Sequence, residues 1–242
     1  MENKSLLIIL PAHNEGLLIS NVIHEINSIL SDTNTKFSFF ISEDGSHDNT
    51  VDELEVLSKQ LKLKYISSKK RKGYAMAVVD GILSAKSDFI LFLDSDGQVD
   101  PKIIPEAFEE IIKKENTIII GNRFIRRDPF IRKIYSKLFF YFYKFLFPIK
   151  LKDPSCPFVL CATKDASLIA KYWLSFGERV SEGFWWEFNA WAYKLNIKFY
   201  EIDVNHRERD GDEKTKVYKL KKMPGIIFRN VIGIIRVYCE KI

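Results

Sequence analysis

The chain has 242 residues, of which 46% are hydrophobic and 29% are charged, and its formal net charge is +5. This balance is typical of a folded globular protein and excludes an intrinsically disordered chain. The length suits one large α/β domain or a domain with a small appendage. The mild positive charge does not by itself indicate a partner, and we expect no nucleic-acid ligand. Three cysteines (Cys156, Cys161 and Cys239) match no zinc or redox spacing, which favours a reducing compartment.

No segment of the sequence predicts export or a membrane span. The apolar run at residues 6–10 is too short for the core of a signal peptide. Residues 134–149 are interrupted by Lys137 and Lys144, so they fall short of the roughly 20 uncharged apolar residues that a spanning helix needs. We therefore expect a cytoplasmic protein that is either soluble or attached peripherally to the cytoplasmic face of a membrane.

Strand and helix patterns alternate along the first half of the chain. The expected strands are residues 6–10, 37–42, 64–67, 89–94 and 117–121. The expected helices between them are residues 14–30, 50–60, 73–86 and 102–115. This alternation predicts right-handed βαβ units, and hence an α/β fold with a mostly parallel, Rossmann-like central sheet flanked by helices. In such sheets, ligands bind at the carboxyl ends of the strands.

The second half is richer in aromatic residues. We expect helices at residues 130–147 and 183–195, a strand at 198–204 and a final helix at 226–241. In the final apolar segment, Lys222, Arg229 and Arg236 recur every seven residues. Such an amphipathic helix lies on anionic lipid or packs on the core or a partner with one wet edge, and the sequence leaves both open. The expected organisation is one domain over residues 1–216, followed by this C-terminal helix over 217–242.

Polar side chains follow three of the expected strands. Asp94 and Asp96 come directly after a continuous apolar run, and their i, i+2 spacing projects both to the same side. Two carboxylates this close repel each other unless a cation lies between them, and hard divalent ions prefer such oxygen ligands. Asp-Ser-Asp-Gly suits a solvated turn equally well. Glu43-Asp44 and Gly121-Asn122-Arg123 end two other strands, and this convergence favours a ligand site at that edge.

Several motifs occur in the order found in family 2 inverting glycosyltransferases. These are Leu10-Pro11-Ala12-His13-Asn14-Glu15, Glu43-Asp44-Gly45-Ser46, Lys72-Gly73 and Asp94-Ser95-Asp96-Gly97-Gln98. Three later motifs resemble the polyprenyl-phosphate sugar transferase branch of that family: Gly121-Asn122-Arg123, Asp153-Pro154-Ser155, and Arg209-x-Gly211 with Lys214. The resemblance covers roughly residues 5–216 and implies a GT-A fold.

The resemblance also implies roles for individual residues. It implies a GDP- or UDP-linked sugar donor and a divalent cation, Mg²⁺ or Mn²⁺, with Asp94, Asp96 and Gln98 as the metal ligands. The implied donor-binding residues are Pro11, Asn14, Glu15, Glu43, Asp44, Lys72, Gly73, Asp94, Ser95, Arg209 and Lys214. The catalytic candidates are Asp96, Arg123, Arg132 and Asp153. Arginine belongs in this group because its planar fork matches phosphate oxygens.

The acceptor is the less certain half of the expected reaction. The resemblance implies inverting transfer to a polyprenyl phosphate, dolichyl or undecaprenyl, which is already an anion and needs no general base. A hydroxyl acceptor requires a carboxylate base, for which Asp153 and Glu187 are the candidates. A soluble or glycan hydroxyl acceptor therefore stays open as an alternative. So does a catalytically silent nucleotide-sugar-binding protein, and the sugar, the base and the oligomeric state are not encoded in any motif.

Overall fold

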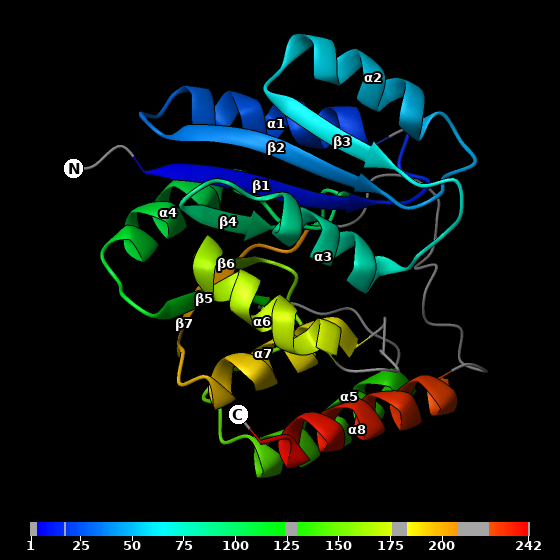
Figure 1. Ribbon diagram of the computed structural model, residues 1–242, viewed down its shortest axis with the longest axis vertical. Helices are drawn as coiled ribbons and strands as arrows, with labels where there is room; N and C mark the ends of the chain where they lie inside the picture. Colours follow the sequence, from blue (N-terminus) through cyan, green and yellow to red (C-terminus); the bar gives the residue numbers. More distant parts are fainter. Residues whose placement is uncertain (1–3, 17, 124–129, 176–182, 208–222, 242) are drawn as a thin grey trace.

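A computed structural model describes residues 4–16, 18–123, 130–175, 183–207 and 223–241, with the backbone alone for 130–135 and 223. These residues form a seven-stranded sheet in the order β3-β2-β1-β4-β6-β5-β7 (Figure 1). The strands are β1 (Ser5–Ala12), β2 (Lys36–Glu43), β3 (Leu63–Ser67), β4 (Phe89–Phe92), β5 (Thr117–Arg123), β6 (Val159–Ala162) and β7 (Lys198–Val204). All neighbouring pairs are parallel except those made by β6, which runs antiparallel to β4 and β5. The predicted mostly parallel α/β sheet is confirmed.

Helices cover the sheet and then build outward from it. They are α1 (Ile19–Ser31), α2 (Thr50–Gln60), α3 (Tyr74–Ser84), the 3-10 turn η1 (Pro101–Ile103), α4 (Ile104–Ile112), α5 (Phe130–Leu146), α6 (Thr163–Ser175), α7 (Phe184–Lys194) and α8 (Met223–Cys239). Helix α3 packs on β1 and β2, α6 packs on α3 and α7, and α8 packs on α7 and α5. Helices α5 and α8 lie side by side, on the far side of the molecule from β3 and α2 (Figure 1).

The central strands are apolar because they are buried on both faces. In β1, residues 6–10 are buried without exception, and in β4 only the first residue is half-buried. A strand covered by helices on both sides has no solvent face to mark with polar residues, which explains its continuous apolar run. Because β1 pairs parallel with both β2 and β4, the carboxyl ends of the three strands come to one edge of the sheet, where their polar residues begin.

Three parts of the sheet region differ from the expectation. Helix α1 begins five residues later than predicted, because Asn14 adopts a positive φ of 55° and the Glu15 carbonyl accepts hydrogen bonds from Leu18 and Ile19. The sequence analysis also missed β6 and α6 entirely. β6 has four residues, no alternation of polar and apolar side chains, and no turn before Thr163 opens the next helix. β4 ends at Phe92 rather than at Asp94, so both aspartates lie in the following turn.

The C-terminal helix forms as predicted, and its inner side joins the core. Ile226, Ile234 and Val237 are buried, and the latter two belong to the main hydrophobic cluster. The boundary expected at residue 216 lies outside the described residues. Among the helices that the structure describes, none has both the length and the apolar character to span a bilayer.

Helix α3 approaches the sheet unusually closely at Gly81. A Cβ atom added there would lie 2.4 Å from Cγ2 of Ile9 in β1, a side chain that is completely buried. Contacts this short force neighbouring atoms to move, and a packed strand has little room to do so. Glycine at this position therefore sets the distance between α3 and β1.

Replacement of Gly81 by alanine tests this close approach. We expect Gly81→Ala to lower the free energy of unfolding in urea by about 1–3 kcal/mol through overpacking, although alanine is the better helix former by about 1 kcal/mol. Leu83→Ala on the same helix is the control, because Leu83 is 64% exposed and surface changes stay within about 0.5 kcal/mol. Equal or greater stability of Gly81→Ala would contradict the account.

Candidate functional site

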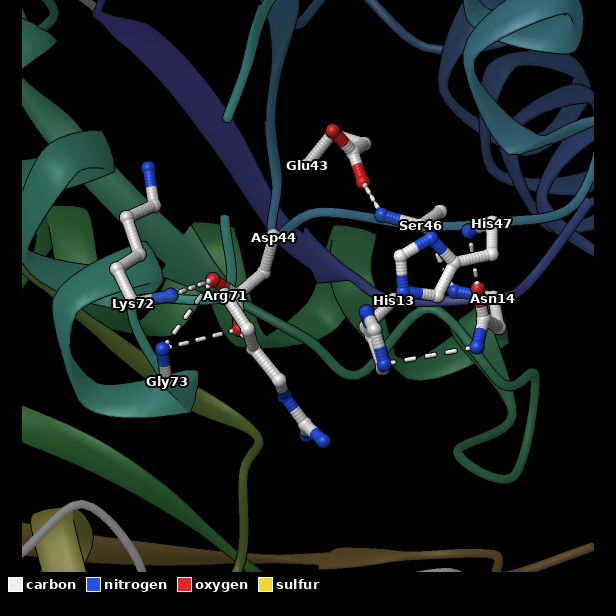
Figure 2. A network of polar contacts seen from close by, with 9 residues as sticks. All are labelled: His13, Asn14, Glu43, Asp44, Ser46, His47, Arg71, Lys72 and Gly73. Carbon is white, nitrogen blue, oxygen red and sulfur yellow. Dashed lines mark hydrogen bonds and ion pairs between the residues drawn. The ribbon is translucent and has the colours of Figure 1, made fainter. Parts of the chain in front are cut away.

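The loops that follow β1 and β2 are joined by hydrogen bonds (Figure 2). The backbone N–H of Asn14 donates to Oγ of Ser46 at 2.8 Å, and Oδ1 of Asn14 accepts from the backbone N–H of His47 at 2.8 Å. His13 lies beside the same amide, with Nε2 3.5 Å from Nδ2 of Asn14. The Asn14 side chain is therefore part of the scaffold that holds these two loops together.

A second set of bonds extends this connection toward α2. The backbone N–H of Glu15 donates to Oγ1 of Thr50 at 2.9 Å, and that of Gly16 donates to the Asp48 carboxylate at 3.1 Å. Asp48 also accepts the backbone N–H of Thr50 at 3.0 Å. These contacts place the predicted donor-binding residues Asn14 and Glu15 beside the acidic loop after β2.

Glu43 is a buried carboxylate at the end of β2. It accepts hydrogen bonds from the backbone N–H of Ser46, from Oγ of Ser67 at 2.7 Å and from the backbone N–H of Ser68 at 3.3 Å. Burial alone would raise the pKa of Glu43, but these donors outweigh it, so the pKa lies below its ordinary value. An ionised Glu43 thus connects the ends of β2 and β3, and its role toward a donor stays a prediction.

Asp44 holds the loop that leads into α3. Its carboxylate accepts the backbone N–H groups of Lys72 at 2.6 Å and Gly73 at 3.0 Å, and Nε of Arg71 lies 3.5 Å away (Figure 2). Gly73 has a positive φ of 93°, a conformation that favours glycine. The Lys72 ammonium pairs with Asp80 on α3. The roles of Asp44 in reading a base and of Lys72 in contacting a diphosphate stay predictions.

Asp94 lies in the turn after β4, and its carboxylate is bonded to α3 directly and to α7 through one intervening hydroxyl. The hydroxyl of Tyr74, the first residue of α3, donates to Oδ1 of Asp94 at 2.8 Å, and Nε1 of Trp185 in α7 donates to that hydroxyl at 2.9 Å. Burial, together with the neighbouring charge of Asp96, raises the pKa of Asp94 to about 7. The negative charge on Asp94 is thus incompletely compensated by the protein.

The rest of the acidic turn is bonded to its surroundings. Ser95 is buried, and its hydroxyl donates to the Pro11 carbonyl at 2.8 Å, which connects the ends of β4 and β1. The backbone N–H of Gln98 donates to Oδ1 of Asp96 at 3.1 Å, and Gly97 has a positive φ of 71°. The segment is thus a hydrogen-bonded turn, as one interpretation of the sequence had it. A turn of this kind does not exclude a cation site, because Asp94 and Asp96 remain neighbours within it.

Arg123 and Asp153 form an ion pair at the end of β5. Nε of Arg123 donates to Oδ2 of Asp153 at 2.6 Å, and the guanidinium also donates to Oδ1 at 3.1 Å and to Oγ of Ser155 at 3.1 Å. The charge of Arg123 lowers the pKa of Asp94, against the larger effects of burial and Asp96, so the two side chains share one electrostatic environment. The structure therefore pairs the catalytic candidates Arg123 and Asp153, and the charges of Arg123 and Asp96 both act on Asp94.

The segment after β7 is fixed to the acidic turn. The backbone N–H of Arg207 donates to the Gln98 carbonyl at 2.7 Å, and its guanidinium pairs with Glu25 at 2.9 Å and Asp100 at 2.7 Å. Arg209 and Lys214, which follow shortly after, lie outside the described residues. Arg132 lies on α5, but its side chain is outside the description as well, so its predicted role is untested by the geometry.

The acidic turn suits a divalent cation that takes some of its ligands from the protein and the others from a bound substrate. Within the described ranges, no group of three or more His, Cys, Asp and Glu side chains gathers as a self-contained metal centre. The Asp94–Asp96 pair is nevertheless the donor set that Mg²⁺ or Mn²⁺ takes when phosphate oxygens complete the coordination. The raised pKa of Asp94 reflects a charge that such a cation would balance. The residues present therefore fit this ion, with Gln98 at the end of the same turn.

Tyr74 and Trp185 were missed by the sequence analysis. Trp185 lies 111 residues from Tyr74 in the chain, and no local pattern indicates that their side chains meet. The one available signal was the position of Tyr74 directly after the Lys72-Gly73 motif. Their contact orients a candidate metal ligand from behind, which is a common arrangement for ligating carboxylates.

A mostly parallel seven-stranded sheet flanked by helices is the architecture of the GT-A class of α/β proteins. The chain belongs to glycosyl transferase family 2: the profile of this family matches residues 7–168, more than half of the sequence. The resemblance inferred from the motifs is thereby confirmed.

Two relatives with assigned activities are similar to this chain in sequence. A dolichol-phosphate mannosyltransferase of Pyrococcus furiosus is 31% identical over 135 residues, which are 54% of this chain but 38% of that protein. A dolichyl-phosphate beta-glucosyltransferase of Dictyostelium discoideum is 26% identical, and the match covers 97% of this chain and 77% of that protein. The chain thus corresponds to only part of the length of these relatives.

A solved structure shares the fold at low sequence identity. Glucosyl-3-phosphoglycerate synthase from Mycobacterium tuberculosis, in complex with Mn²⁺, UDP-glucose and phosphoglyceric acid, superposes with a TM-score of 0.71 at 13% identity. The match covers 99% of this chain and 81% of the synthase. At this identity the likeness concerns the fold.

The raised pKa of Asp94 predicts a pH-dependent effect of Asp94→Asn on stability. The folded-state pKa is about 7 against 3.8 for an unperturbed group, so the folded protein loses stability as the pH rises from about 4 to about 7. Asparagine has no charge to bury. The free energy of unfolding is measured in urea with chelator present. As the pH rises over that interval, its value for the variant should increase relative to that of the wild type by at least about 1 kcal/mol. A constant difference across the interval would show that Asp94 is not perturbed.

The orienting hydrogen bond predicts that Tyr74→Phe weakens cation binding. The variant lacks the Tyr74 hydroxyl, so Asp94 loses the hydrogen-bond donor that lies 2.8 Å away. We therefore expect the affinity for Mn²⁺ to fall by about tenfold. The measurement is the electron paramagnetic resonance signal of free Mn²⁺ during titration. Tyr200→Phe, at a residue that is 41% exposed, is the control and should leave the affinity unchanged. The same affinity in Tyr74→Phe as in the wild type would refute the orienting role.

Proposed function

We propose that this protein transfers a sugar, with inversion, from a GDP- or UDP-linked donor to the phosphate of a polyprenyl lipid, with Mg²⁺ or Mn²⁺ at Asp94 and Asp96. The observation on which this rests most is the acidic pair itself, because the desolvation of the half-buried Asp94 beside Asp96 leaves negative charge that a cation with a diphosphate would balance. The action on dolichyl phosphates stated in the names of the two relatives supports the lipid acceptor. The neighbour crystallised with Mn²⁺ supports the cation.

The donor would bind at the edge of the sheet formed by the carboxyl ends of β1, β2 and β4. Asp94, Asp96 and Gln98 would hold the cation, which when bound supplies charge neutralisation for the departing nucleoside diphosphate. Tyr74 keeps the Asp94 carboxylate in one orientation through its hydroxyl. The predicted donor contacts Asn14, Glu15, Glu43, Asp44, Lys72 and Gly73 come from loops whose backbone is held by hydrogen bonds, so little ordering of these loops is left to the moment of binding.

The acceptor assignment rests on the state of the two candidate bases. Asp153 is ion-paired with Arg123 at 2.6 Å, and Glu187 accepts a hydrogen bond from Nε1 of Trp173 at 2.6 Å between α7 and α6. Both carboxylates are thus engaged, which favours an acceptor that needs no proton removed. A phosphate requires positioning alone. Within the described residues, Arg123 uses three of its five guanidinium donors on Asp153 and Ser155, which leaves two for a phosphate.

The alternative is transfer to a hydroxyl group of a soluble or glycan acceptor. The feature that favours it is Glu187. Burial raises the pKa of this residue to about 7, a value suited to a general base. Its hydrogen bond to Trp173 and its interaction with the charge of Arg236 are also those of a structural carboxylate. The lipid acceptor is therefore the stronger proposal, and it implies work at the cytoplasmic face of a membrane.

A labelled-donor assay tests the proposal. With Mn²⁺, a panel of labelled UDP- and GDP-sugars and polyprenyl phosphate, we expect label from one donor to enter the organic phase. Asp96→Asn should reduce this transfer by at least about a hundredfold, because it removes charge stabilisation of the leaving group. Asp52→Asn, at an exposed position in the first turn of α2, is the control and should transfer normally.

The other outcomes of the same assay discriminate between functions. Label that reaches a soluble sugar or glycan, but never the organic phase, would replace the lipid proposal by the hydroxyl alternative. Binding of a nucleotide sugar without consumption of any donor in the panel would indicate a silent binding protein. Full activity of Asp96→Asn would overturn the assigned role of the acidic pair.

A further inference from the structure

Helix α7 packs against the strand that precedes the acidic turn. The ring of Phe92, the last residue of β4, lies 5.3 Å from that of Trp185 and 6.3 Å from that of Phe188. The helix also packs on α6 and α8 (Figure 1). Eight of its eleven residues are buried, so α7 is a fixed part of the core.

Two side chains on one face of α7 make hydrogen bonds outside the helix. Trp185 and Asn189 are four positions apart, which places them on the same face, one turn apart. Nε1 of Trp185 donates to the Tyr74 hydroxyl, which in turn donates to Asp94. Nδ2 of Asn189 donates to the carbonyl oxygen of Pro154 at 2.8 Å. One face of α7 is thus bonded through a hydroxyl to the acidic turn and directly to the segment between α5 and β6.

The carbonyl that Asn189 holds lies between the two partners of Arg123. Pro154 is preceded by Asp153 and followed by Ser155, and both of these accept hydrogen bonds from the guanidinium. Oγ of Ser155 also donates to Oδ1 of Asp153 at 2.8 Å. A displacement of the Pro154 peptide would therefore move both acceptors relative to Arg123.

Asn189 is an unfavourable residue for its position unless this bond matters. Its side chain is completely buried, and among the described residues its Oδ1 has no hydrogen-bond partner. A buried amide oxygen without a partner destabilises the fold, whereas a leucine of similar size would avoid this penalty. The bond from Nδ2 to Pro154 is what distinguishes the amide from leucine here.

We propose that α7 is the common support of the two charged groups of the site. Trp185 positions Asp94 through the intervening hydroxyl, and Asn189 positions the Arg123–Asp153 pair through the intervening carbonyl. Both are positioning residues, because each acts through another group. Since one buried helix makes both bonds, it sets the placement of the cation site relative to Arg123. The inference rests on the proposed function only for what the two groups bind, the cation and the acceptor phosphate.

Two variants on successive turns of α7 should therefore affect different halves of the site. Trp185→Phe removes the indole N–H and keeps an aromatic ring, and Asn189→Leu removes the amide and roughly keeps the volume. In a Mn²⁺ titration followed by electron paramagnetic resonance, we expect Trp185→Phe to lower the affinity by at least about threefold. Asn189→Leu is the matched control and should bind Mn²⁺ like the wild type.

The exchange of the Arg123 Nε–H with water tests the other half. This proton is bonded to Asp153 at 2.6 Å, and its ¹⁵N-correlated signal is identified by its loss in Arg123→Lys. Asn189→Leu should speed its exchange by at least about tenfold, because the turn that carries its acceptor opens more often. Trp185→Phe is now the control and should leave the exchange rate unchanged. Asn189→Ala, which adds no atoms to the core, should repeat the result of Asn189→Leu.

Transfer to farnesyl phosphate shows how the two positions act on the reaction. Asn189→Leu should raise the KM for this acceptor, whereas Trp185→Phe should raise the Mn²⁺ concentration that gives the half-maximal rate. Circular dichroism checks that the variants fold. Loss of both readouts together in both variants would indicate a merely structural helix and overturn the proposal, as would either variant with its own readout unchanged. Absence of transfer in the wild type would reject the proposed function and leave the cation and exchange results intact.

Discussion

The desolvation of the half-buried Asp94 beside Asp96 is the constraint on which the rest of the site depends. A carboxylate removed from water next to another carboxylate is unfavourable unless its surroundings compensate it. The protein compensates it in part, through the Tyr74 hydroxyl from α3, which Trp185 of α7 supports, and through the charge of Arg123 from β5. Three elements that are distant in sequence therefore converge on one side chain, and the remaining charge is what a cation and a diphosphate would balance.

The carboxylates at this edge of the sheet fall into two groups. Glu43, Asp44 and Asp48 each accept backbone N–H groups from neighbouring loops, and this fixes the loops that are predicted to bind the donor. Asp94 and Asp96 receive fewer such bonds and repel each other. Acidic residues that look equivalent in the sequence thus have different surroundings, because backbone donors reach every member of the first group but only Asp96 of the second.

Local patterns predicted the fold well where a segment determines its own structure. The helix over 50–60 and the strand over 198–204 form with the expected bounds, since their patterns are complete within each segment. The four residues of β6 were missed because a short apolar run is compatible with several structures. The motifs indicated Arg123 and Asp153 separately, but not their ion pair, and the Tyr74–Trp185 contact left no local signal. Pairings across the fold depend on tertiary packing, which one sequence does not encode locally.

The central claim is that the acidic pair binds the donor through a cation. The most direct measurement is calorimetric titration of the preferred nucleotide sugar into the wild-type protein and into Asp94→Asn/Asp96→Asn, each with Mn²⁺ and with chelator. The account predicts that Mn²⁺ strengthens donor binding by at least about tenfold in the wild type and has no effect in the double variant. Equal donor affinity in the wild type with and without the cation would contradict it.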